Sequence, residues 1–153
     1  MAHPGVSKTA RELIARYHKA MLDKDAKALA DLYAVDGVHE FPLLSPFFPQ
    51  RLNGRDAVGK HYGAVWNASP IRLLEIREIA LHETSDPKVT VSEAEFTAET
   101  SEGKSFALAF AIVMHVENGL IVHLRDYMDA LGVAYNLGRL DVLVQALERR
   151  RQG

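Results

Sequence analysis

The sequence predicts an α+β domain in which a curved antiparallel sheet wraps around packed N-terminal helices. Apolar residues recur at helical spacing as far as Trp66, and from Ile71 onward they follow the two-residue period of strands. Asn118-Gly119, between two strand-like runs, is the dipeptide most typical of a tight hairpin turn. Helices therefore come first along the chain, and an antiparallel meander follows them.

Two helices are predicted near the start of the chain. Thr9 and Glu12 have the spacing of a capping box, with Ser7 as an alternative cap for the first helix. Asp25 can cap a second helix, and Asp36-Gly37 is expected to end it.

A short strand, a loop and a third helix are predicted next. Val38–Phe41 is predicted to be the strand, and Leu43–Leu52 is an apolar loop whose prolines are incompatible with regular helix. Such a loop could cover a pocket mouth, lie in a subunit interface or simply pack on the core. Asn53 is expected to begin the third helix, and Pro70 lies beyond its end.

The second half of the chain is predicted to form long strands followed by helix. Asp129–Arg150 is expected to be helical, with interruptions near Gly132 and Gly138. The four predicted strands are Ile71–His82, Lys88–Thr100, Lys104–Glu117 and Leu120–Met128.

Length and composition limit the possible functions. The 153 residues fit one domain spanning 1–153, with residues 1–6 and 149–153 expected to be flexible. Eighteen Lys plus Arg against 20 Asp plus Glu disfavour a nucleic-acid partner. The absence of Cys excludes disulfides and thiolate sites. With no apolar run typical of a signal or a membrane helix, we expect a cytoplasmic protein. No His spacing suggests a metal site, so we expect neither metal nor cofactor.

Three acidic residues, Glu93, Glu95 and Asp126, fall on the predicted strands. Side chains alternate along a strand, so Asp126 shares its face with Leu124 and Met128. Glu93 and Glu95 share one face of the second long strand. Both faces of that strand carry apolar residues as well. One face is therefore expected to meet the helices, and the other to meet a second subunit.

These acids, a histidine and a tyrosine are the candidate chemical groups. If Glu95 and Asp126 share an apolar pocket, burial and like charge raise a carboxyl pKa, which yields an acid and a base from one pair. His39 could accept a substrate proton, and Tyr17 could supply a pocket hydroxyl. The alternatives are glutamates on a solvated strand face, a structural hydrogen bond for Asp126, and His39 and Tyr17 as packed core residues.

Five segments, in order, resemble the nuclear transport factor 2-like superfamily, and more closely its SnoaL-like and ketosteroid isomerase-like branch. The resemblance implies a cone-shaped fold. Its concave sheet face and helices enclose an apolar pocket for a hydrophobic ligand, and its convex face forms a homodimer. The segments are Ile14-Ala15-Arg16-Tyr17, Asp25 through Tyr33, Asp36-Gly37-Val38, Asn53-Gly54-Arg55-Asp56-Ala57-Val58 and Arg125-Asp126-Tyr127-Met128-Asp129.

The resemblance to ketosteroid isomerases is incomplete at the residues that carry their chemistry. Tyr17 takes the position of their helix-1 tyrosine. Phe41 and Val113 take the positions of their aspartate base and their neutral acid. Steroid isomerisation is therefore disfavoured.

The stretch around Asp126 is similar to limonene epoxide hydrolase-like enzymes. The similarity implies that Asp126 is an acid/base residue and that Glu95 takes the place of the second catalytic aspartate. Glu93 stands where those enzymes have a bridging arginine, and His39 and Phe41 stand where they hold their water. This sequence therefore departs from their machinery.

We predict a SnoaL-like protein with an apolar pocket, acting without cofactor as an acid/base enzyme of isomerase, cyclase or epoxide hydrolase type on a hydrophobic small molecule. The alternatives are a non-catalytic small-molecule-binding protein and a dimeric interaction module. The candidate catalytic residues are Asp126, Glu95, His39 and Tyr17. The candidate pocket residues are Phe41, Trp66, Glu93, Met114 and Val113.

Overall fold

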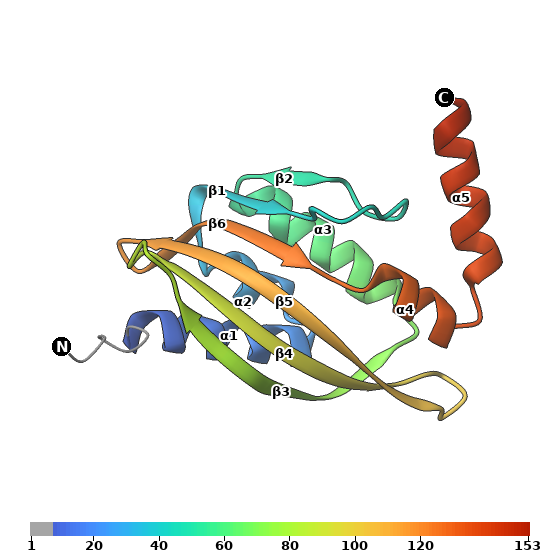
Figure 1. The fold of residues 1–153 in the computed structure, drawn as a ribbon, viewed down its shortest axis with the longest axis horizontal. Helices are drawn as coiled ribbons and strands as arrows, with labels where there is room; N and C mark the ends of the chain where they lie inside the picture. Colours follow the sequence, from blue (N-terminus) through green and yellow to red (C-terminus); the bar gives the residue numbers. More distant parts are fainter. Residues whose placement is uncertain (1–7) are drawn as a thin grey trace.

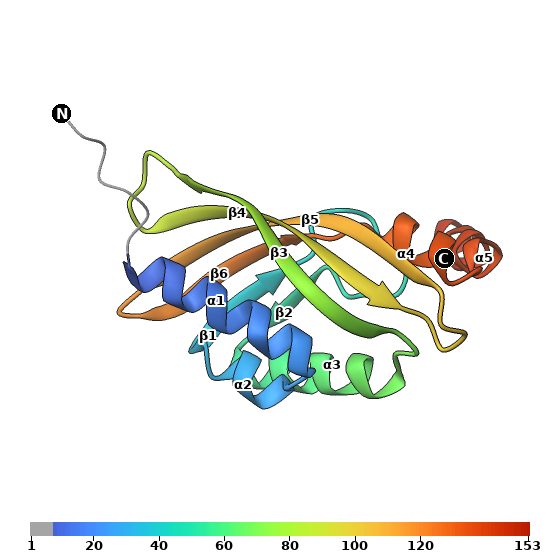
Figure 2. The ribbon, with the colours of Figure 1, turned by 90° about the horizontal axis from the view of Figure 1, so that it is seen from below.

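The computed structural model describes residues 8–153, which form a curved six-stranded sheet with helices against its inner face (Figure 1). Figure 2 shows the three N-terminal helices lying beneath the sheet, with two C-terminal helices at its end. The helices are α1 (Lys8–Asp23), α2 (Ala26–Ala30), α3 (Arg55–Ala68), α4 (Ala130–Asn136) and α5 (Leu140–Gln152). The strands are β1 (Tyr33–Glu40), β2 (Arg51–Asn53), β3 (Arg72–Glu83), β4 (Val89–Glu99), β5 (Ser105–Glu117) and β6 (Leu120–Tyr127).

The sheet has the order β2-β1-β6-β5-β4-β3. Its neighbouring strands are antiparallel except for β1 and β6, which are parallel. The four long strands confirm the predicted meander, and the α+β fold class is confirmed with it. Asn118 and Gly119 both have positive φ, at 50° and 75°, as a two-residue hairpin turn between β5 and β6 requires.

The helix starts agree with the sequence only in part. Asp25 caps α2, because its carboxylate accepts the backbone N–H of Ala28 at 2.9 Å. The predicted cap at Thr9 is wrong, because α1 already includes Lys8, and Ser7 lies outside the described residues. α3 begins after Gly54 (φ 94°) rather than at Asn53, which belongs to β2.

The strand β1 is longer than predicted. It begins at Tyr33, so the segment Asp36-Gly37 lies inside a strand and does not end a helix. Gly37 is required there by a close approach of two backbones. A Cβ at this position would lie 2.7 Å from the carbonyl oxygen of Ile121 on β6. The β1–β6 register also shifts between Tyr33 and Val38.

The C-terminal part of the chain is helical, as expected, but it has one interruption rather than two. Gly138 (φ 66°) separates α4 from α5, whereas Gly132 lies inside α4. Residues 149–152, which were expected to be flexible, belong to α5, and residues 1–6 lie outside the described part. Among the described helices, none has both the length and the apolar character needed to cross a membrane.

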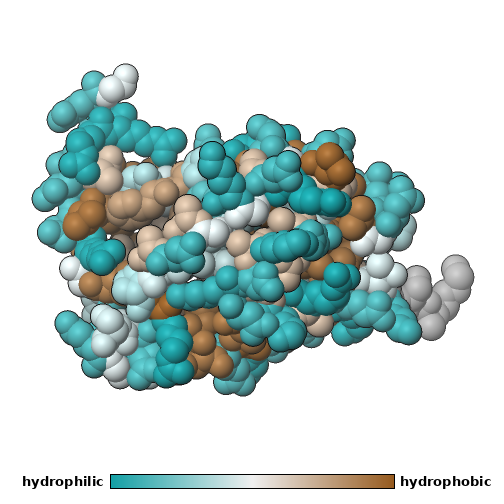
Figure 3. All heavy atoms as spheres, turned by 180° about the vertical axis from the view of Figure 1, so that it is seen from behind, coloured by the Kyte–Doolittle hydropathy of each residue, from teal (hydrophilic) through white to brown (hydrophobic). Residues whose placement is uncertain are grey.

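The surface and the interior differ strongly in polarity. On the side shown in Figure 3, hydrophilic side chains cover most of the surface and apolar side chains form separate patches. The main core lies between the helices and the inner face of the sheet. Among its fully buried members are Ile14, Tyr17, Leu29, Ile112, Met114 and Leu124.

Candidate functional site

A cavity of about 430 Å³ lies between α3, α4 and the inner face of the sheet. Its walls are mainly apolar and aromatic, which is the usual character of a small-molecule site. The apolar wall residues include Phe41, Phe48, Trp66, Phe96, Phe110 and Met128. Phe48 belongs to the proline-rich loop and stacks on Phe41 with ring centroids 5.2 Å apart, so this loop forms part of the cavity wall.

Asp126 is the acidic residue of this cavity. It lies on β6 opposite Ile112 of β5, and it shares the inward face of β6 with Leu124. The residue is only 8% exposed. The strand alternation therefore places a nearly buried carboxylate in an apolar wall, where desolvation strengthens its interactions with neighbouring donors.

Two neighbouring side chains, His39 of β1 and Tyr62 of α3, connect to Asp126. The Tyr62 hydroxyl donates to Asp126 Oδ2 at 3.4 Å and lies 3.1 Å from His39 Nε2. His39 Nε2 is itself 3.6 Å from the same carboxylate oxygen. On its other side, His39 Nδ1 lies 2.8 Å from the hydroxyl of Tyr33. Four buried polar side chains therefore form one connected cluster.

The direction of these bonds assigns the protons. Because Tyr62 donates its only hydroxyl proton to Asp126, it can only accept from His39, so Nε2 of His39 carries a proton. In the neutral imidazole, Nδ1 then accepts the hydroxyl proton of Tyr33. This arrangement leaves no buried polar atom of His39 without a partner.

The tyrosines of the cluster stay protonated. Burial raises the pKa of Tyr62 well above its usual value, and the nearby charge of Asp126 adds to the shift. Burial likewise raises the pKa of Tyr33 well above normal, with smaller contributions from Tyr17 and Asp126. Both hydroxyls are therefore neutral donors at physiological pH.

The fold fixes the cluster from several sides. Tyr33 begins β1, and its backbone carbonyl accepts two hydrogen bonds from the Arg55 guanidinium at the start of α3. His39 pairs with Leu124 in the parallel β1–β6 ladder. β1 is thus joined to α3 by the Arg55 side chain and to β6 by backbone pairing, both close to the cluster.

Tyr17 lies deeper than expected. It is fully buried on α1 and is not part of the cavity wall. Burial raises its pKa well above normal, and Tyr62 and Asp126 add to this shift. Tyr17 therefore stands behind the cluster rather than in the cavity.

The expected pairing of Glu95 with Asp126 is absent, because Glu95 lies on the opposite face of the sheet. The inward positions of β4 are occupied by Ala94, Phe96 and Ala98, and both alanines are fully buried. Glu95 instead pairs with Arg77 of β3 at 3.1 Å. The two-carboxylate arrangement inferred from the sequence is therefore wrong.

The other expected pocket residues divide into three groups. Phe41 and Trp66 line the cavity. Met114 is fully buried on the inner face without lining the cavity. Glu93 and Val113 face outward, which corrects their placement in the pocket. Glu93 pairs with His82 at 2.5 Å on the exposed side of the sheet, and Val113 lies opposite Val91 and Arg125.

Sequence reasoning missed Tyr62 and Tyr33 as site residues. Tyr62 shares a helix face with Val58 and Trp66, so it read as part of an apolar stripe. Only the tertiary structure shows that its hydroxyl meets a strand residue 64 positions away. In residues 8–153, no three His, Asp or Glu side chains gather as a metal centre would need.

Comparison with known proteins places this geometry in context. Residues 14–124 match the model of the SnoaL-like domain. An uncharacterised PhzA/B-like protein of Pseudomonas aeruginosa is 25% identical over 141 residues, which cover 91% of this chain and 97% of that protein.

Two solved structures share the fold. A Bacillus subtilis protein provisionally named an isomerase has a TM-score of 0.77 and 24% identity, with 86% of this chain and 94% of that chain covered. An LEH-like epoxide hydrolase of M. tuberculosis has a TM-score of 0.63 and 16% identity, with 92% and 93% covered. At these identities the structural likeness establishes the fold and leaves the chemistry to the residues of the site.

Proposed function

The chain belongs to the SnoaL-like domain family, and on that premise we propose that it is an acid/base enzyme acting on an apolar small molecule beside Asp126. One observation carries the proposal. A nearly buried carboxylate, held by Tyr62 and adjacent to His39, stands in the wall of an apolar cavity of about 430 Å³. A positioned carboxylate in such a site is suited to moving a proton.

The reaction class that fits is proton transfer at a carbon next to a carbonyl, as in isomerases and cyclases. Asp126 takes the proton from the substrate carbon and returns it at the same or another atom, so the enzyme ends unchanged. Tyr62 and His39 keep the carboxylate oriented and are positioning residues in this scheme. The proposed role of Tyr17 is to hold the Tyr62 hydroxyl in position, because the two buried hydroxyls interact with each other.

Epoxide opening by two acids is not favoured for this chain. That chemistry would require a second carboxylate in the cavity, and the candidate Glu95 is paired with Arg77 on the outer face. The proposal therefore rests on a single carboxylate and its donors.

A non-catalytic binding protein is the second candidate, and the cavity itself supports it. Aromatic walls with few polar groups are what a binding protein for an apolar ligand needs. The two candidates differ in whether their function requires the carboxylate of Asp126. An enzyme loses turnover when this carboxylate becomes an amide, whereas a binding protein retains its ligand. Proton exchange at the α-carbon of a hydrophobic ketone, measured with and without Asp126→Asn, separates them.

The outer face of the sheet is the proposed contact with a second copy of the chain. In support, β5 presents the small residues Ala107, Ala109 and Ala111 on this face, and Val113 lies beside Val91 of β4. Small apolar side chains on a broad sheet face allow two sheets to approach closely.

A further inference from the structure

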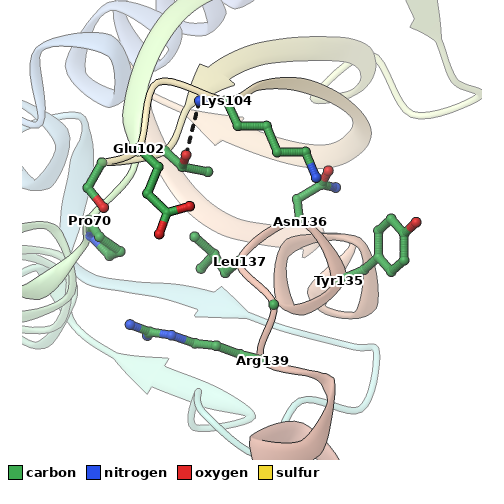
Figure 4. Close-up of a pocket in the computed structure, with 10 residues that line it drawn as sticks. Pro70, Glu102, Lys104, Tyr135, Asn136, Leu137 and Arg139 are labelled. Carbon is green, nitrogen blue, oxygen red and sulfur yellow. Dashed lines mark hydrogen bonds between the residues drawn. The ribbon is translucent and has the colours of Figure 1, made fainter.

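Arg139 lies where two cavities meet. A second groove, of about 480 Å³, runs between α4 and the turn that joins β4 to β5. It shares Pro70, Leu137 and Arg139 with the main cavity. In Figure 4 the Arg139 side chain extends from the α4–α5 connection toward the side of the groove where Pro70 lies. A ligand that fills the main cavity and reaches outward would therefore pass this guanidinium.

The charged residues of the main cavity come from different elements of the fold. Asp126 lies on the inner face of the sheet, where it is nearly buried. The two cations of the wall, Lys24 and Arg139, come from the segments that follow α1 and precede α5. Lys24 is half-buried and donates to the carbonyl of Ile71 at 2.5 Å, whereas Arg139 is exposed. The cavity wall therefore carries one acid on the sheet and two cations from the segments beside the helices.

The guanidinium of Arg139 is free to bind. It makes no hydrogen bond or ion pair with any residue between 8 and 153. The outer groove also contains Glu102 and Lys104, one acid and one base, and neither forms an ion pair with it. The positive charge of Arg139 is thus not neutralised by the protein side chains around it.

We propose that Arg139, assisted by Lys24, binds an anionic group on the ligand whose apolar body occupies the main cavity. The planar guanidinium fork matches the two oxygens of a carboxylate, and a sulfonate offers the same chemistry. The substrate class is therefore an apolar acid, held at its charged end so that its reactive carbon lies toward Asp126. This inference rests on the proposed function, because it concerns the same cavity.

A matched pair of fluorescent probes tests the anion site. 1-Anilinonaphthalene-8-sulfonate and N-phenyl-1-naphthylamine have the same aromatic body, and only the first carries a sulfonate. Trp66 is the only tryptophan of the chain and lines the cavity, so quenching of its fluorescence reports a probe bound there. Titrations of the protein at low salt give a Kd for each probe.

We expect Arg139→Gln to weaken binding of the sulfonate probe by about three- to fivefold, as loss of one charge-assisted contact at an exposed site implies. Binding of the neutral probe should change less than about twofold, because it lacks the sulfonate that the guanidinium would hold. Arg149→Gln makes the same charge change further along α5, away from the cavity, and should leave both affinities unchanged.

The outcomes separate the anion site from the cavity. If Arg139→Gln leaves the affinity of the sulfonate probe unchanged while the neutral probe still binds, the anion site is refuted and the apolar cavity stands. If neither probe quenches Trp66 in the unaltered protein, the cavity fails as a binding site and the anion site fails with it. An equal loss of both probes in Arg139→Gln would also refute the anion site, because the effect would not depend on charge.

Discussion

The hydroxyl of Tyr62 on α3 lies 3.4 Å from Oδ2 of Asp126 on β6. This contact joins the helical layer to the sheet at the cavity wall, and His39 Nε2 approaches the same hydroxyl from β1 at 3.1 Å. The carboxylate is therefore oriented by a group outside its own strand. Its position depends on how helix and sheet pack together, and this dependence is what the first prediction tests.

Tyr62→Phe should slow proton exchange without removing it. The substitution keeps the aromatic ring and deletes the hydroxyl, so Asp126 loses its donor and the Nε2–H of His39 loses its acceptor. We expect about a tenfold loss of kcat and a drop of about 1–3 kcal/mol in the free energy of unfolding. Tyr135→Phe, on an exposed side chain of α4, is the matched control. Equal rates and equal urea stability for both variants would contradict the role given to Tyr62.

The stability of the protein should decrease as the pH falls below about 6.5, partly because of His18. Burial lowers the pKa of His18 in the folded state, and its Nε2 has no hydrogen-bond partner in the described part of the chain. The unfolded chain binds a proton there at higher pH than the native state does. The stabilisation is therefore complete above the unfolded pKa and is lost as the pH falls through it toward the folded value.

The measurement is urea unfolding between pH 5 and 8, together with NMR titration of the His18 ring. We expect His18→Gln to flatten the pH dependence over this range. A His18 ring that titrates at or above the ordinary histidine value would contradict the prediction.

Gly37→Ala and Gly63→Ala should change stability in opposite directions. A Cβ at residue 37 would lie 2.7 Å from the Ile121 carbonyl oxygen, and two backbones cannot separate without disrupting the β1–β6 pairing, so we expect a loss of about 1–3 kcal/mol. A Cβ at residue 63 in α3 would meet Ala26 Cβ at an ordinary 3.7 Å, and helix propensity then favours alanine by up to about 1 kcal/mol. Thermal or urea unfolding measures both. If Gly37→Ala is as stable as the parent protein, the close approach of β1 and β6 is wrong.

Ala109→Arg should dissociate the proposed homodimer. Ala109 is exposed in the isolated chain, on the outer face of β5. A long cation there would hold two sheet faces apart and remain unpaired between them. Light scattering coupled to size exclusion should show a dimer for the parent protein and a monomer for the variant. Ser105→Arg, an exposed change at the start of β5, is the control. A monomeric parent protein would refute the interface.

The sequence predicted the meander well because its signals are local. Strand alternation and the turn at Asn118-Gly119 need only neighbouring residues, and the structure has both where they were expected. The start of β1 was misread because Asp36-Gly37 has the composition of a turn. Gly37 is there for a different reason, which is its contact with a strand 84 positions later at Ile121.

The site was only half predictable for the same reason. Strand alternation shows which residues of β4 share a face. Because both faces carry apolar residues, the sequence does not show which face points inward. Ala94 and Ala98 are fully buried on the inner face of β4, so strand alternation places Glu95 on the outer face. Asp126 was identified because its strand has an apolar face and because the stretch around it resembles limonene epoxide hydrolase-like enzymes. Tyr62 was hidden because a tyrosine on an apolar helix stripe gives no sign of whether its hydroxyl meets a carboxylate.

The most direct test of the account is α-proton exchange on a hydrophobic ketone in D₂O, with 2-tetralone as the probe and NMR as the readout. The parent protein should exchange the α-protons faster than buffer at the same pH, and Asp126→Asn should reduce that acceleration by about 10²- to 10⁴-fold, as loss of a catalytic base implies. Circular dichroism and retained quenching of Trp66 by N-phenyl-1-naphthylamine confirm that the variant is folded with its cavity intact. Exchange by the parent protein no faster than buffer, or equal exchange by Asp126→Asn, would contradict an acid/base role for this carboxylate.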